Sequence, residues 1–210
     1  MKYLYLHGFA SGKDSKKGVA LAKHFAARGL ALERLDLRVP SLEHLRLSSM
    51  MEKVRDAIGG AEDRAIVLGS SLGGLTAARV AERDPRVVSL VLLAPAFQLA
   101  ARWSERVGEA GWRAWEESGW LEVEDHTTGG RARVDFEFTR DVARIDATPF
   151  PEVRVPTLVV HGTHDEVVDV GLSRTFARSR PNVRLVEVDD GHELIASLGR
   201  ISCEIDDFLP

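Results

Sequence analysis

The stretch that most constrains the fold is residues 66–74, an apolar run that ends in a serine placed between glycines. Because Gly69 and Gly73 lack a Cβ, the backbone can turn sharply from a strand into a helix and hold Ser71 in a strained, exposed conformation. Residues 65–68 are typical of a buried strand. The residues that follow recur at helical spacing: Leu72, Leu75, Thr76 and Val80. This context favours a nucleophile elbow over the alternative, a glycine-rich turn with an ordinary hydroxyl.

Apolar runs alternate with helical patterns along the chain, which is typical of a parallel sheet covered by helices on both faces. We expect strands at residues 2–7, 31–36, 65–68, 87–93, 157–162 and 183–188. Helices are expected around residues 19–26, 40–58, 72–83, 170–178 and 194–208. The sequence therefore predicts an α/β protein.

The character of the chain changes at residues 97–148, which we interpret as a lid segment inserted into a single domain of residues 1–210. All four tryptophans fall in one helix-like stretch: Trp103, Trp112, Trp115 and Trp120. Residues 122–127 and 131–138 resemble the arms of a hairpin around Gly129 and Gly130. Aromatic rings here can form an apolar wall above the serine, so Trp103, Trp112 and Trp115 are candidate substrate-pocket residues. Alternatively, they only pin the lid segment to the core.

The charge balance and the cysteine content exclude several classes of protein. With 28 Lys and Arg against 32 Asp and Glu, the net charge is -4 and no basic block is present, so we expect no nucleic-acid partner. No segment approaches the length of a membrane span, and the apolar residues 3–6 are too few for a signal-peptide core, so we expect a cytoplasmic location. Cys203 is the single cysteine, which leaves no intrachain disulfide, and its place between Ile201 and Ile205 predicts a core thiol. Nothing in the sequence sets the oligomeric state.

Two polar residues that follow later strands can serve as partners of Ser71. A serine hydroxyl needs a base within hydrogen-bond reach, and the base needs a group that holds its tautomer. Asp165 and His192 each follow a predicted strand, at the sheet edge where open parallel sheets form their sites. The chain order Ser71, Asp165, His192 is the order that this topology requires. Asp165 could instead cap a turn, and His192 could face solvent in a first helical turn.

Backbone amides that would bind a developing oxyanion are expected at two positions. One is the N–H group of Leu72, directly after the serine at a helix N-terminus. The other is the N–H group of Phe9, because Gly8 lets the loop after the first strand approach closely. Each donor of this kind lowers the barrier by roughly 3 to 4 kcal/mol. The alternative for His7 and Gly8 is a plain turn that ends the strand.

Four motifs resemble those of the α/β-hydrolase superfamily, and within it those of the small bacterial YqiA-like esterases. They are Leu6-His7-Gly8-Phe9, Gly69-Ser70-Ser71-Leu72-Gly73-Gly74, His161-Gly162-Thr163-His164-Asp165 and Gly191-His192. The resemblance implies a minimal α/β-hydrolase fold with a mostly parallel sheet of about six strands. It also implies a serine esterase or thioesterase in which Ser71 is the nucleophile, Asp165 the acid and His192 the base.

We therefore expect a hydrolase of carboxylic esters that acts on a small-molecule substrate and needs neither a metal nor an organic cofactor. A peptidase, an acyltransferase or a carbon-carbon bond hydrolase would carry the same motifs. Two alternatives come from other classes. One is a non-catalytic, ligand-binding member of the fold. The other is a metallohydrolase, whose candidate ligands would be His161, His164, Asp165 and His192.

Overall fold

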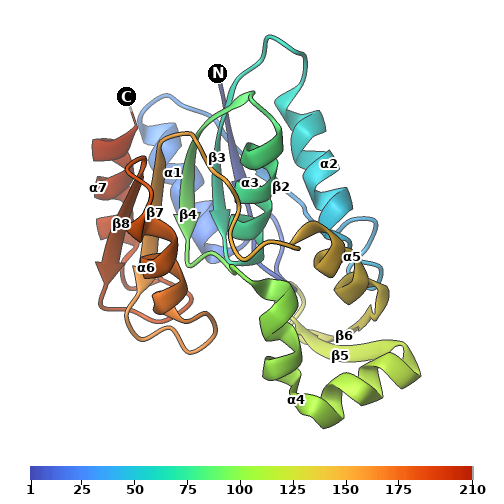
Figure 1. Ribbon diagram of the computed structural model, residues 1–210. Helices are drawn as coiled ribbons and strands as arrows, with labels where there is room; N and C mark the ends of the chain where they lie inside the picture. Colours follow the sequence, from blue (N-terminus) through green and yellow to red (C-terminus); the bar gives the residue numbers. More distant parts are fainter. Residues whose placement is uncertain (210) are drawn as a thin grey trace.

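The computed structural model describes residues 1–209, and its centre is a six-stranded parallel sheet (Figure 1). The strand order is β2-β1-β3-β4-β7-β8, and every neighbouring pair is parallel. The strands are β1 (Lys2–Leu6), β2 (Leu32–Leu35), β3 (Ala65–Ser70), β4 (Val87–Leu93), β7 (Thr157–Gly162) and β8 (Val183–Val188). The predicted α/β fold with about six strands is confirmed.

Helices cover both faces of the sheet (Figure 1). One apolar cluster packs α2 (Leu47–Ile58), α3 (Leu72–Arg83) and α6 (Val170–Arg178) against the first face. A second cluster packs α1 (Lys16–Ala27) and α7 (Leu198–Phe208) against the other face. The central strands must therefore be apolar on both sides, which explains their unbroken hydrophobic runs.

The lid segment leaves the sheet after β4 and returns before β7. It consists of α4 (Leu99–Ser118), β5 (Trp120–Asp125), β6 (Gly130–Asp135) and α5 (Glu137–Ile145). The antiparallel β5–β6 hairpin was expected from the sequence, whereas α5 was not. The prediction that all four tryptophans lie in one helix-like stretch is wrong in two respects. The helix α4 bends at Gly108, which has a φ of 72°, and Trp120 lies on β5. Within residues 1–209, no helix combines the length and the apolar character needed to cross a membrane.

The start of α2 differs from the prediction, which opened this helix near residue 40. The helix begins at Leu47, where the carboxylate of Asp141 on α5 accepts hydrogen bonds from the amide and the hydroxyl of Ser48, both at 2.8 Å. Just before it, the carboxylate of Asp135 on β6 binds His44 at 2.6 Å and Arg46 at 2.7 Å. Two acids of the lid segment therefore decide where α2 starts, and they override the local helical pattern.

The prediction that Cys203 is a core thiol is wrong, because this side chain is exposed. Ile201 and Ile205 are both fully buried, and they lie about one helical turn apart on the same face of α7. A residue midway between them points to the opposite face. The helix is also shorter than expected, since it begins at Leu198.

Candidate active site

Ser71 lies between β3 and α3 at a turn that only glycine neighbours permit. Its backbone has a φ of 54° and a ψ of -117°, a strained conformation for a residue with a Cβ. A Cβ on Gly73 would lie 2.3 Å from the carbonyl oxygen of Leu6, and one on Gly69 would lie 2.3 Å from the carbonyl oxygen of Gly73. The sharp passage from strand to helix therefore presses α3 against β1 and raises the serine hydroxyl above the sheet edge.

Three side chains from three strand ends converge at this edge. The Nε2 atom of His192, on the loop after β8, lies 3.0 Å from the Oγ of Ser71. The Nδ1 atom of the same ring lies 2.7 Å from the Oδ2 of Asp165, on the loop after β7. A proton on Nδ1 is donated to the carboxylate, which leaves Nε2 free to accept the serine proton. The geometry thus brings together the three residues that the sequence singled out.

The carboxylate of Asp165 is fully buried and accepts hydrogen bonds on both oxygens. The backbone amides of Val167 and Val168 donate to Oδ1, both at 2.8 Å. Burial alone would raise the pKa of Asp165, but the hydrogen bonds from His161, His192 and Val168 outweigh it and hold the pKa well below its usual range. The carboxylate is therefore ionised, and it both shapes its own turn and orients the imidazole.

His161, the fifth residue of β7, contacts the same carboxylate from inside the protein. Its Nε2 atom lies 2.9 Å from the carbonyl oxygen of Val168 and 3.1 Å from the Oδ2 of Asp165, so it donates toward both. Its Nδ1 atom accepts from the hydroxyl of Ser173 at 2.7 Å. The sequence showed His161 only as part of a motif and as a candidate metal ligand. No sequence signal placed Ser173 beside it.

The two amides expected to bind an oxyanion flank Ser71. Leu72 is the first residue of α3, and Phe9 lies in the loop after β1. A Cβ on Gly8 would lie 3.4 Å from the Cβ of Ser71, so this loop runs directly beside the serine. Among residues 1–209, the amides of Phe9 and Leu72 form no hydrogen bond, which leaves both donors available to a ligand.

His7 holds the loop after β1 in place. Its Nε2 atom accepts from the amide of Leu37 at 2.9 Å, and its Nδ1 atom donates to the carbonyl oxygen of Gly8 at 2.9 Å. Burial lowers the pKa of His7, which favours the neutral ring that this pattern requires. The lid segment touches the same loop, because the amide of His126 donates to the carbonyl oxygen of Ala10 at 2.9 Å.

The three candidate pocket tryptophans lie in different surroundings. The ring of Trp103 contacts Phe9 edge-on, with centroids 4.9 Å apart, and its Nε1 atom is buried without a partner in the described residues. Trp115 is 1% exposed and donates to the carbonyl oxygen of Val134 at 3.0 Å. Trp112 packs against Phe136, with centroids 5.2 Å apart. In this conformation Trp103 is the one that reaches the loop beside the serine, whereas Trp112 and Trp115 pack within the lid segment.

The residues of the metallohydrolase alternative do not form one cluster. His164 turns outward to Asp189, with 2.7 Å between the ring Nε2 and the carboxylate, and both side chains are exposed. Within residues 1–209, no group of three or more His, Cys, Asp and Glu side chains is arranged to hold a metal ion.

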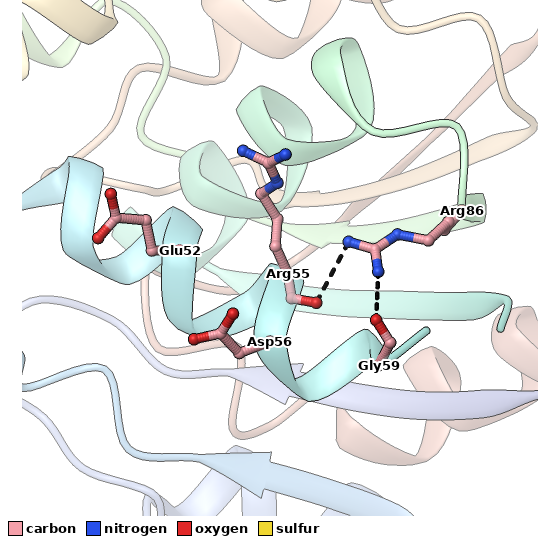
Figure 2. A pocket seen from close by; sticks show the side chains of 5 residues that line it. All are labelled: Glu52, Arg55, Asp56, Gly59 and Arg86. Carbon is pink, nitrogen blue, oxygen red and sulfur yellow. Dashed lines mark hydrogen bonds between the residues drawn. The ribbon is translucent and has the colours of Figure 1, made fainter. Parts of the chain in front are cut away.

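Figure 2 shows the residues that line a surface hollow: Glu52, Arg55, Asp56, Gly59 and Arg86. Arg86 precedes β4 and Gly59 follows α2, so the hollow lies at the opposite, amino-terminal edge of the sheet. The guanidinium of Arg86 donates to the carbonyl oxygens of Gly59 and Arg55 and thereby caps α2. This cation is therefore already engaged in holding the fold.

A family model described as "Uncharacterised protein family (UPF0227)" matches residues 2–207. The chain belongs to this family. The match confirms the resemblance to the YqiA-like family that the motifs indicated. A comparison with curated proteins gave no match.

Solved structures of low sequence identity share the fold of this UPF0227 protein. Mouse alpha/beta hydrolase domain-containing protein 10 has a TM-score of 0.80 at 22% identity, over 98% of this chain and 88% of that chain. Est1E from Butyrivibrio proteoclasticus with ferulic acid bound has a TM-score of 0.76 at 20% identity, over 98% of this chain and 86% of that chain. Monoacylglycerol lipase from Paleococcus ferrophilus has a TM-score of 0.71 at 15% identity, over 96% of this chain and 93% of that chain. The fold is that of the α/β hydrolases.

Proposed function

We propose that the protein is a serine hydrolase that cleaves carboxylic esters or thioesters through an acyl-enzyme on Ser71. The observation that carries the proposal is the continuous hydrogen-bond chain from Ser71 through His192 to Asp165, with distances of 3.0 Å and 2.7 Å. A serine that is merely structural needs neither a strained backbone nor a base held in the accepting tautomer.

The proposed reaction uses each of these groups in turn. The Oγ of Ser71 attacks the carbonyl carbon while Nε2 of His192 takes its proton, and the carboxylate of Asp165 stabilises the imidazolium. The amides of Phe9 and Leu72 donate to the oxyanion. When the intermediate collapses, the bond to the leaving group breaks and His192 returns the proton to the leaving oxygen or sulfur. Water then attacks the acyl-enzyme in the same way and releases the acid.

We further propose that Trp103 lines the substrate pocket, with Trp112 and Trp115 supporting it from within the lid segment. The edge-on contact between Trp103 and Phe9 places an aromatic ring next to the proposed oxyanion donor. Since the related fold of Est1E has been solved with ferulic acid, a substrate panel should include aromatic as well as aliphatic acyl groups. The same panel, with alcohol, thiol and amine leaving groups, separates an esterase from a peptidase.

Covalent labelling with a fluorophosphonate probe tests the proposal. We expect rapid labelling of the wild-type protein, which is lost in Ser71→Ala and retained in Ser70→Ala, a control that removes the neighbouring buried hydroxyl. Ester hydrolysis that survives in Ser71→Ala but collapses on addition of a chelator would favour a metallohydrolase. Absence of both labelling and hydrolysis in a folded wild-type protein would favour a non-catalytic member of the fold.

A further inference from the structure

Lys17, the second residue of α1, reaches the loop that carries His192. Its ammonium group donates to the backbone carbonyl oxygen of His192 at 3.3 Å, across 175 residues of sequence. The first turn of α1, which carries Lys17, is held in place by a helix cap and by close packing against β1. The hydroxyl of Ser15 caps it by accepting from the amide of Gly18, and a Cβ on Gly18 would lie 2.6 Å from the ring of Tyr5 on β1.

The surroundings of this ammonium are unusual for a lysine. Burial lowers the pKa of Lys17 to about 8, although the nearby charges of Glu193, Asp165 and Asp190 act in the opposite direction. Within residues 1–209, no carboxylate lies close enough to form an ion pair with it. The neighbouring Lys16, by contrast, is exposed. Lys17 is partly buried, so holding its charge at this place costs some solvation free energy that no ion pair offsets.

We infer that Lys17 is a positioning residue for the proposed reaction: its ammonium holds the carbonyl group of His192 and thereby keeps the imidazole aligned between Ser71 and Asp165. This inference rests on the proposed function. The side chain of Asp190 holds the turn before His192 through the amide of Ser197, whereas Lys17 binds the carbonyl oxygen of His192 itself. Hydrogen bonds from charged donors are about twice as strong as neutral ones, which suits a lysine better than a hydroxyl or an amide for this contact.

The test compares Lys17→Met and Lys17→Arg with a matched control, Lys16→Met, in the full chain. For each protein, the rate of fluorophosphonate labelling and the melting temperature are measured. We expect labelling of Lys17→Met to fall on the order of 10-fold or more, since a displacement of about 1 Å in an active site can cost roughly 100-fold. Its melting temperature should stay near that of the wild type, because the substitution removes no ion pair and leaves no carboxylate without a partner. Lys17→Arg should restore most of the rate, and Lys16→Met should match the wild type.

A second measurement of the labelling rates at higher pH separates the effect of the charge of Lys17 from the effect of its shape. At about pH 9.5 most of a lysine whose pKa is about 8 is uncharged. The ratio of the labelling rate of the wild type to that of Lys17→Met should therefore be smaller at about pH 9.5 than at about pH 7. Lys17→Arg should still be labelled faster than Lys17→Met at the higher pH, because arginine keeps its charge. If Lys17→Met does not fold, Lys17→Gln takes its place.

Two outcomes would overturn the inference. One is equal labelling of the wild type and Lys17→Met at neutral pH, and the other is a rate ratio that does not change with pH. Failure of the wild-type protein to react with the probe at all would instead count against the proposed function itself.

Discussion

Gly162, the last residue of β7, is a position where a single added methyl group should disturb the proposed site. A Cβ there would lie 2.3 Å from the carbonyl oxygen of Asp190 and 2.6 Å from that of Gly191, the two residues that precede His192. Ordinary contact begins at 3.4 Å, so the turn must move by about 1 Å. It has little freedom to do so, because the side chain of Asp190 also accepts from the amide of Ser197 at 2.9 Å.

We therefore expect Gly162→Ala to lose roughly 1 to 3 kcal/mol of unfolding free energy, the usual cost of overpacking. The same shift of about 1 Å displaces His192, so fluorophosphonate labelling should slow by up to about 100-fold. Gly199→Ala is the matched control, because a Cβ there meets nothing within 4 Å and alanine favours the helix α7 by roughly 0.4 to 1 kcal/mol. Urea unfolding and labelling kinetics measure both effects. A Gly162→Ala variant with wild-type stability and rate would refute the close packing on which this reasoning depends.

Three further predictions address the acid, the lid segment and the cysteine. Because the folded state lowers the pKa of Asp165, its carboxylate stabilises the fold above the unfolded pKa of about 4 and loses this effect as the pH falls below it. The stability difference between Asp165→Asn and the wild type should therefore shrink on acidification in chemical unfolding experiments. Asp165→Asn should also impair turnover, because the carboxylate that orients His192 is lost. Asp141→Ala should cost about 1 kcal/mol or more in the same experiment through loss of the cap on α2, whereas an unchanged midpoint would contradict that role. A thiol reagent should modify exposed Cys203 in the folded protein without changing the rate of the proposed ester hydrolysis, as mass spectrometry and an activity assay would show.

The elements that were predicted correctly are those whose signal is local. β4, β7 and β8 occur at the expected residues, because a strand buried between two layers of helices needs a continuous apolar run. The turn at Ser71 could also be predicted from the sequence, because its glycines avoid steric clashes within the same few residues and with β1.

What could not be predicted depends on contacts between distant segments. The start of α2 is decided by Asp141, which lies 93 residues beyond Ser48 in sequence. The pairing of His161 with Ser173 and the reach of Lys17 to His192 likewise have no counterpart in a local pattern. Such polar contacts become visible only when the fold brings their partners together.

The most direct test of the central claim is to stop the hydrolysis of an activated aryl ester during turnover and to map the acyl group by peptide mass spectrometry. We predict a single acylated peptide that contains Ser71, absent in Ser71→Ala and more abundant when Asp165→Asn slows the removal of the acyl group. Acylation at another residue, or undiminished turnover in Ser71→Ala, would contradict the account.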